Sequence, residues 1–260
     1  MKIAVYDTCL TDAQWALLQP ILPKPSKRGR PPTERRWVVN AILYLVKGGV
    51  QWRLLPIHFP PWQTVYHIFR KWTLDHTWES INAKLRGKVR KAQGKRTRPT
   101  AAILDSQSVK SDPHGGEVGY DAAKRIKGRK RHLLVDTLGL LLGIEITPAS
   151  TPERDGAQTL LKEVLKGFAW LQLMWVDGGY SGPAFAQWVR GIRPKLRTEV
   201  VKRSDDTTGF AVLPRRWVVE RTFAWFMRHR RLVRDYETSA DSAKAFAYIA
   251  MIRIQLRRLA

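Results

Sequence analysis

The chain contains a single cysteine, Cys9, among its 260 residues. One thiol cannot form an internal disulfide or supply a zinc site that is built from several thiolates. Long apolar runs are also missing, since no stretch approaches the roughly 20 residues needed to cross a bilayer. The start of the chain lacks the pattern of a signal peptide. We therefore expect a protein of a reducing compartment, with no membrane partner.

Acidic residues are scarce as well. The 22 Asp and Glu residues face 46 Lys and Arg residues, which gives a net charge of +24 and a pI near 10.7. Such an excess of positive charge favours a polyanionic partner, and nucleic acid is the first candidate. The charge is spread over the chain, +14 before Pro99 and +10 from there on, whereas a membrane-surface protein gathers it on one amphipathic helix. Both halves are expected to contact nucleic acid in the cytoplasm.

Residues 1–98 read as a helical domain. Apolar residues at helical spacing predict four helices, with Thr11 and Thr33 as caps of the first two. The helices are expected at Leu10–Leu22, Thr33–Gly48, Trp62–Leu74 and Trp78–Lys91. Short helices, a glycine turn at Gly48-Gly49 and a basic face favour a helix-turn-helix-like DNA-binding module, with Gln63, Arg70 and Lys71 on its reading helix. A helical cap or dimerisation domain fits the same pattern.

Residues 99–260 read as a second, α/β domain. Short apolar segments that end in polar or turn residues predict strands, and they alternate with amphipathic helices. Strands are expected at Ala101–Asp105, Lys130–Asp136, Leu140–Thr147, Leu171–Asp177 and Glu199–Lys202, and helices at Arg154–Lys166, from Ser181 to Arg190 and at Ala240–Leu259. This order predicts a mixed sheet with helices packed against it.

The segment Arg215–Arg231 holds one carboxylate, Glu220, among six arginines and one histidine. If the whole segment is helical, Arg216 and Arg231 share a stripe with Glu220. A salt-bridged surface helix explains this pattern without any function. The other interpretation depends on two aspartates upstream.

Those aspartates, Asp105 and Asp177, each end an apolar strand. Side chains at the ends of adjacent strands meet in the crevice where ligands bind, and two carboxylates there repel each other unless a cation or proton intervenes. Together with Glu220 they supply the oxygen ligands that Mg²⁺ prefers. Two such ions would support in-line displacement at a phosphodiester. Taken singly, an aspartate at a strand end is commonly only a turn residue.

A basic run, Lys124–Arg131, precedes one of the predicted strands. It is either a solvated charge run or, beside the strand of Asp105, a clamp for DNA phosphates in which Lys127, Arg129, Lys130 and Arg131 take part. Among the tryptophans, Trp217 and Trp225 are candidates for stacking on an unpaired base, with core packing as the alternative.

Four motifs in this order resemble those of DDE transposases, and most closely the insertion-sequence transposases of the insertion-sequence-four and -five superfamily. They are I-L-D-S-Q-S-V-K-S around Asp105, K-G-R-K-R-H-L-L-V-D-T-L-G at Lys127–Gly139, W-V-D-G-G-Y-S-G around Asp177 and R-R-W-V-V-E-R-T-F-A-W-F around Glu220. In the N-terminal region, L-T-D-A-Q-W and G-V-Q-W-R-L-L-P also resemble that group.

The resemblance implies a ribonuclease-H-like catalytic domain in which Asp105, Asp177 and Glu220 bind two Mg²⁺ ions, with Mn²⁺ as a substitute. It also implies a bacterial, nucleoid-associated enzyme that nicks the terminal inverted repeats of its element and joins the 3′-hydroxyl ends to target DNA. Bringing two DNA ends together implies a homodimer or a higher assembly on double-stranded DNA. A catalytically silent DNA-binding regulator is the alternative, and a plain nuclease is a third reading.

Related families carry a Tyr-Arg-Glu-Lys signature around the glutamate. Arg216 matches its arginine, whereas Leu213 and Met227 stand at the tyrosine and lysine positions. We expect Arg231 to replace the missing lysine as a phosphate contact.

Overall fold

The computed structural model describes residues 6–24, 33–112, 116–201 and 216–260. Helices make up the N-terminal region, as predicted. They are α1 (Asp12–Leu18), which continues into the short helix η1 (Gln19–Ile21), then α2 (Arg35–Gly48), η2 (Trp52–Leu54), α3 (Trp62–Leu74) and α4 (Thr77–Ala92). Thr11 caps α1 through a capping box, and Gly49 takes the left-handed conformation that ends α2 (φ 74°). The predicted Thr33 cap is wrong, because α2 begins at Arg35 without a side-chain cap.

The second part of the chain forms a six-stranded mixed sheet. Its strands are β1 (Ala101–Lys110), β2 (Gly119–Asp121), β3 (Ile126–Asp136), β4 (Leu141–Pro148), β5 (Leu173–Val176) and β6 (Arg197–Val200). They lie in the order β2-β3-β1-β5-β6, and β4 also pairs with β3. β3 runs antiparallel to β1 and β4, whereas β5 is parallel to both β1 and β6. The predicted mixed α/β sheet is confirmed. The predicted end of the first strand at Asp105 is wrong, because β1 stays paired with β3 as far as Lys110 and Asp105 lies in its middle.

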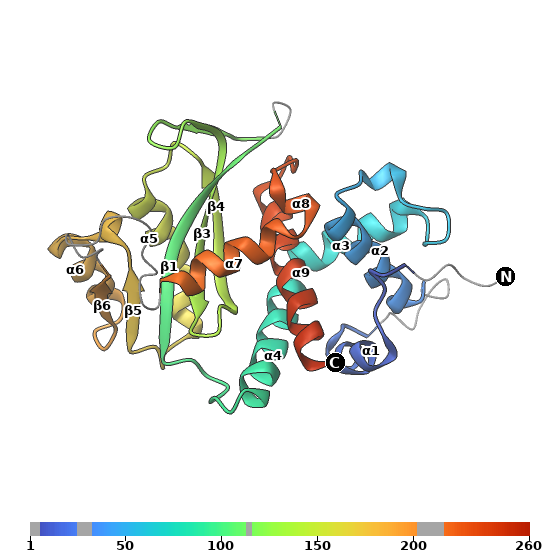
Figure 1. Cartoon of the computed structure of the whole chain (residues 1–260), viewed down its shortest axis with the longest axis horizontal. Coiled ribbons are helices and arrows are strands. Elements are labelled where there is room, and N and C mark those ends of the chain that lie inside the picture. Colours follow the sequence, from blue (N-terminus) through green and yellow to red (C-terminus); the bar gives the residue numbers. More distant parts are fainter. Residues whose placement is uncertain (1–5, 25–32, 113–115, 202–215) are drawn as a thin grey trace.

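Helices cover both faces of the sheet (Figure 1). On one face lie α5 (Glu153–Val164) and α6 (Pro183–Ile192), which bury Leu104 and its neighbours in one core cluster. On the other face lie α7 (Trp217–Met227) and α9 (Ala240–Leu259), which bury Ile103 in a second cluster. Alternate residues of β1 enter opposite cores because successive strand side chains point to opposite faces. The predicted Ser181 cap is wrong, since Gly182 precedes α6.

Helix α9 is buried between the sheet and the N-terminal helices (Figure 1). It contacts α1, α2, α3, α4 and β4, and apolar residues on all its sides fit a helix that is enclosed by protein. One hydrophobic cluster runs from the N-terminal helices through α9 to the sheet. The division into residues 1–98 and 99–260 stays a prediction, and the helices before residue 98 share their core with the rest of the chain.

The helix that carries Glu220 is shorter than predicted. α7 ends at Met227, His229 has extended backbone (φ −109°, ψ 109°), and a separate turn, α8, spans Arg230–Val233. Arg231 therefore does not continue the stripe of Glu220 along one helix.

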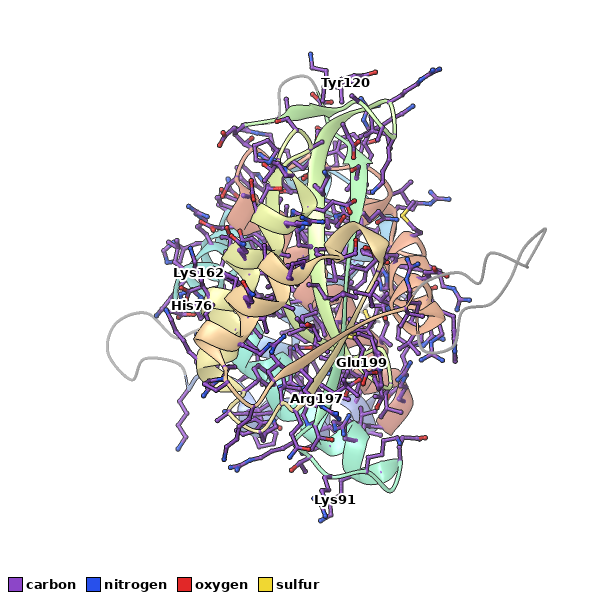
Figure 2. The ribbon with its side chains drawn as sticks, turned by 90° about the vertical axis from the view of Figure 1, so that its left-hand side faces the viewer. His76, Lys91, Tyr120, Lys162, Arg197 and Glu199 are labelled. Carbon is purple, nitrogen blue, oxygen red and sulfur yellow. The ribbon has the colours of Figure 1, made fainter. Side chains whose placement is uncertain are left out.

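Figure 2, which looks onto β6 with Arg197 and Glu199, shows α5 and α6 in front of the sheet. Within the described ranges no helix is long and apolar enough to cross a membrane.

Candidate active site

The register of two parallel strands brings Asp105 and Asp177 together. Ala101 of β1 pairs with Leu173 of β5, and Ile103 pairs with Trp175. Two residues further along, Asp105 and Asp177 stand at the same level. Asp105 shares the alternation of Ile103 and so points to the face that α7 covers. That face carries Glu220 in the first turn of α7.

Arg216 lies among the three carboxylates. Its Nη2 atom is 3.7 Å from Oδ2 of Asp105, 3.8 Å from Oδ2 of Asp177 and 3.9 Å from Oε1 of Glu220. The Asp105 side chain is 13% exposed and that of Glu220 is 55% exposed. The cluster therefore has one end in the sheet and the other at the surface. The structure brings together the three acidic residues and the arginine that the sequence singled out.

The pKa of Asp105 is raised to about 6. Burial is the main cause, and the negative charges of Asp177 and Glu153 act in the same direction. A 2.7 Å hydrogen bond from the Ser106 backbone N–H and the charge of Arg216 oppose it. Asp177 is more open and accepts a 2.9 Å hydrogen bond from the Gly179 N–H. Additional positive charge at this place would favour ionised Asp105.

A fourth carboxylate, Glu153, escaped the sequence analysis, which began the helix one residue later. It opens α5 and accepts 2.9 Å hydrogen bonds from the Ser106 hydroxyl and the Lys124 ammonium. Burial opposes its ionisation, but Lys124 and Ser106 hold its pKa below the usual value. Ser106 points to the α5 side of the sheet while Asp105 points to the α7 side. The signal that could have identified Glu153 in the sequence is an acidic residue in the first turn of a helix.

The donor set fits a hard divalent cation in type and number, because three carboxylates converge from three separate parts of the chain. Mg²⁺ ligands lie at about 2.0–2.1 Å, whereas these oxygens lie 3.7–3.9 Å from a shared guanidinium nitrogen. In the described part of the chain, no three such side chains stand at metal-binding distances. The carboxylates would have to close on an ion, and Arg216 would have to give up its central position.

An open cavity of about 450 Å³ adjoins the carboxylates. Asp105 and Glu220 line it, together with Lys124 and the apolar side chains of Phe223 and Met227. A cation and two carboxylates on the wall of an accessible cavity give room for a phosphate group next to the acidic cluster.

The predicted phosphate clamp needs correction at three of its four residues. Arg129 donates to the carbonyl oxygens of Glu117, Glu237 and Thr238 and pairs with Asp235, and Arg131 donates to the Leu232 carbonyl. Both are buried, since β3 has neighbours on both sides. These guanidinium groups tie the sheet to the C-terminal segment and are not available to DNA.

Lys130 points the other way and is also buried. Its ammonium donates to the Thr151 carbonyl and lies 3.6 Å from Asp121. Of the four predicted clamp residues, only Lys127 is exposed. A strand alternates its side chains between two covered faces, so a basic run on it becomes interior salt bridges and hydrogen bonds.

Arg231 is a further correction. Its Nε donates a 2.6 Å hydrogen bond to Oε1 of Glu237, its Nη1 donates to the Val50 carbonyl at 2.6 Å, and its guanidinium lies 4.9 Å from the Phe246 ring centroid. The residue is buried. It joins α8 to the N-terminal helices and is not a surface contact for phosphate.

The predicted reading helix coincides with α3. Gln63 and Lys71 are exposed, and Arg70 is half-buried. Tyr66, on the same surface, is 39% exposed. These side chains remain candidates for contact with DNA.

Comparison with known proteins independently supports the resemblance to transposases. Residues 96–254 match the family model described as the transposase DDE domain, and residues 10–82 match the model of the IS4/5 family of transposases. A relative from Burkholderia cepacia, the "Insertion element IS402 uncharacterized 16.2 kDa protein", is 29% identical over 117 residues, which cover 42% of this chain and 78% of the relative. No solved structure matches.

Proposed function

Because the chain belongs to the family of DDE transposases, we propose that it binds the terminal inverted repeats of its own element, nicks the strands by metal-assisted hydrolysis and joins the 3′-hydroxyl ends to target DNA. The two family matches support the transposase role. The observation that supports the chemistry most directly is the convergence of Asp105, Asp177 and Glu220 around one guanidinium nitrogen.

In this proposal the three carboxylates hold two Mg²⁺ ions, or Mn²⁺ in their place. The bound ions would activate a water or a 3′-hydroxyl and stabilise the departing oxygen of the phosphodiester. Asp105, whose pKa is about 6 in the metal-free protein, must lose its proton to serve as a ligand. Arg216, once released from the carboxylates, would contact the scissile phosphate, because it directly precedes the helix that carries Glu220.

Glu153 and Ser106 act as positioning residues in this proposal. The Ser106–Glu153–Lys124 hydrogen bonds fix the middle of β1 against α5. They also hold the Lys124 ammonium on the wall of the cavity that the carboxylates line. A cation held there would neutralise charge on an incoming phosphate.

DNA is the partner that the charge of the whole chain favours. In the proposal, the exposed side chains Gln63 and Lys71 of α3 contact the terminal repeats, with half-buried Arg70 beside them. Two ends must be held together for transposition, so the protein acts as a homodimer or a higher assembly on DNA. The bacterial nucleoid, in the cytoplasm, is its place of action.

A catalytically silent DNA-binding regulator is disfavoured, because three clustered carboxylates next to a cavity serve no purpose in DNA binding alone and repel phosphate. The decisive experiment incubates the protein with Mg²⁺ and a labelled duplex that carries the inverted repeats flanking its gene. We expect end-specific nicking and strand joining. Binding without nicking would favour the regulator, and cleavage without end specificity would favour a plain nuclease.

The matched pair of variants is Asp177→Asn and Asp241→Asn. Both remove one negative charge, but Asp241 is an exposed residue at the start of α9. Asp177→Asn should abolish nicking and leave DNA binding intact, while Asp241→Asn should cleave like the wild type. Retained nicking by Asp177→Asn would remove Asp177 from the site.

A further inference from the structure

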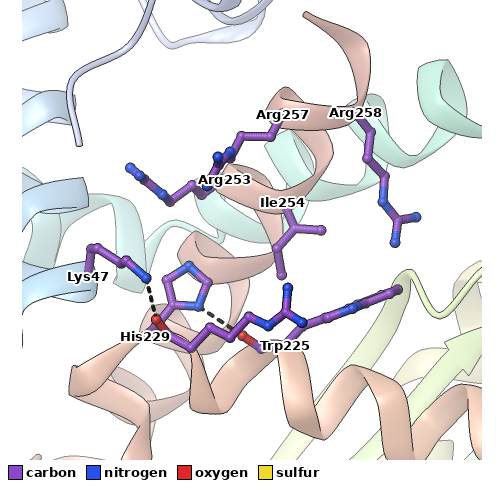
Figure 3. Close-up of a pocket in the computed structure, with 8 residues that line it drawn as sticks. Lys47, Trp225, His229, Arg253, Ile254, Arg257 and Arg258 are labelled. Atoms are coloured by element: carbon purple, nitrogen blue, oxygen red, sulfur yellow. Dashed lines mark hydrogen bonds between the residues drawn. The ribbon is translucent and has the colours of Figure 1, made fainter. Parts of the chain in front are cut away.

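A second concave site lies away from the carboxylates, between α7, α9 and the end of α2. This basic pocket has a volume of about 310 Å³. The cations that line it, and Trp225 beside them, are shown in Figure 3 with their neighbours. The cations are Lys47, Arg228, Arg253, Arg257 and Arg258. The lining contains no carboxylate, which is unusual where five positive side chains gather.

In the described part of the chain no ion pair neutralises these cations, although the charge of Asp7 acts on Arg253 and that of Asp136 acts on Arg258. Within the ranges that the structure describes, none of the five has a carboxylate partner within salt-bridge distance. Instead, Lys47 donates a 2.7 Å hydrogen bond to the Arg228 carbonyl, and buried Arg253 donates one of 2.9 Å to the Thr8 carbonyl. Carbonyl oxygens orient the side chains without cancelling their charge, so the pocket keeps a strong positive potential.

The histidine beside these cations adds no charge of its own to the pocket. His229 is buried against the pocket, and its Nδ1 bonds to the Trp225 carbonyl at 3.1 Å. Its pKa is lowered to about 4, first by burial and then by the positive charges of Arg253 and Lys47. His229 is therefore neutral at neutral pH, and the cations around it are the groups that await an anion.

Trp225 engages cations and is poorly available to a base. The guanidinium groups of Arg258 and Arg221 lie 4.4 Å and 4.7 Å from its ring centroid. The edge of the ring packs on Gly139, where an added Cβ would come within 3.1 Å of it. The indole thus fixes two guanidinium groups by cation–π contact. The pocket therefore offers positive charge to a phosphate, and its indole ring is not free to stack on an extruded base.

Helix α7 connects this pocket to the carboxylates. Glu220 lies in its first turn and Arg228 directly follows its last residue, so the two are about 12 Å apart along the axis at 1.5 Å per residue. Successive phosphates of one strand rise by about 3.4 Å. A duplex that runs parallel to α7 would therefore span the two sites with phosphates a few nucleotides apart.

We propose that the basic pocket binds the phosphodiester backbone of DNA and holds the duplex beside the carboxylate cluster. This assignment rests on the proposed function for the role of the neighbouring carboxylates, but binding at the pocket needs neither metal nor cleavage. An acidic protein partner fits less well, because a protein interface needs an apolar centre and Ile254 is the sole aliphatic side chain in the lining.

The test measures binding of the full-length protein to a mixed-sequence duplex of about 30 base pairs, roughly three helical turns, in EDTA at several salt concentrations. The variant is Arg228→Ala/Arg257→Ala, which removes two exposed cations of the pocket. The matched control is Lys162→Ala/Arg190→Ala. These two residues are exposed on α5 and α6, on the other face of the sheet, and Lys162 is labelled in Figure 2.

We expect the slope of log K against log salt to become shallower by about 1 for each arginine removed, and the control to keep the wild-type slope. Equal slopes for the wild type and the pocket variant would overturn the proposal, as would equal changes in the variant and the control. If the double variant has a lowered melting temperature, Arg257→Gln is measured instead and should lose about 1 unit of slope.

A competition arm separates the classes of partner. Polyglutamate should displace the duplex weakly and without dependence on Arg228 and Arg257. If it binds as tightly as DNA and depends on the same arginines, the pocket is a protein-binding surface and the proposal fails. A pocket-dependent slope in a protein that never nicks end DNA would refute the transposition chemistry and leave the pocket standing. Normal nicking of end DNA, with a salt slope that the pocket variant leaves unchanged, would support the transposition chemistry and refute the role of the pocket.

Discussion

Nε of Arg231 donates a 2.6 Å hydrogen bond to Oε1 of Glu237 inside the protein. Both side chains are buried, at 8% and 9% exposure, and the guanidinium also satisfies the Val50 carbonyl. Burial raises the pKa of Glu237, and the charge of Arg231 works against that rise. The pair links α8 to the segment before α9 and to the end of α2. Its loss should therefore lower the stability of the fold and leave the affinity for DNA unchanged.

Arg231→Ala should therefore lower the free energy of unfolding by about 3–5 kcal/mol, because it leaves a buried carboxylate without its partner. Exposed Arg230 supplies the control, since Arg230→Ala should change stability by less than about 1 kcal/mol. Urea denaturation at pH 8 measures both. An Arg231→Ala protein as stable as Arg230→Ala would show that the pair contributes nothing to the fold.

The loss of stability caused by Arg231→Ala should depend on pH. Without Arg231 the folded-state pKa of Glu237 rises further above its unfolded value, so the folded state binds the extra proton. Stability is then greatest at low pH and falls as the pH rises through the folded pKa. The loss caused by Arg231→Ala should be smaller at pH 5 than at pH 8. A loss that is equal at both values would mean that Glu237 is not the group left unpaired.

Asp105→Asn should stabilise the metal-free protein at neutral pH. The folded pKa of Asp105 is about 6, above the unfolded value of about 3.9. The folded state thus holds more protons between these values, and stability falls as the pH rises through this window. We expect the variant to gain on the order of 2 kcal/mol over the wild type at pH 8 and almost nothing at pH 4. Denaturation in EDTA at both pH values tests this, and a gain of the same size at each would contradict it.

Arg216→Ala should bind Mn²⁺ more tightly in the absence of DNA. The guanidinium occupies the position between Asp105, Asp177 and Glu220, so a cation must compete with it. Its removal also leaves the carboxylates with less compensating charge. Calorimetric titration should show a severalfold decrease in Kd (about 3-fold or more, about 0.7 kcal/mol), while Arg190→Ala, an exposed change on α6, should match the wild type. Weaker Mn²⁺ binding would indicate that Arg216 organises the carboxylates for the ion.

Glu153→Gln should lower the pKa of Asp105, since the charge of Glu153 is one cause of its raised value. The pH at which the stability of the metal-free protein falls should decrease together with this pKa. Glu163, an exposed acid on the same helix with Lys166 as its partner, provides the control in Glu163→Gln, which should leave that pH unchanged. Carbon-13 NMR titration of the Asp105 carboxyl measures the shift. An unmoved titration in Glu153→Gln would separate Glu153 from the acidic cluster.

Local patterns were enough to predict much of the fold. The predicted segments Trp62–Leu74 and Ala240–Leu259 coincide with α3 and α9. Apolar periodicity identifies α3, whereas α9 is apolar on all its sides and the predicted amphipathic face is wrong there. The break after α7 was not predictable in this way. No glycine or proline stands between Met227 and Arg231, and the contacts that hold Arg231 come from Val50 and Glu237.

By itself, the sequence determined the excess of positive charge, the strand–helix order and the presence of an acid in or directly after two strands and on one helix. Only the tertiary structure decided which of the many cations meet solvent. Alternation on β3 sends Arg129, Lys130 and Arg131 into covered faces, whereas Arg228 and Arg257, from separate helical segments, meet at the basic pocket. Burial depends on neighbours that are distant in sequence, so a local charge pattern predicts an attraction to DNA without predicting the surface that exerts it.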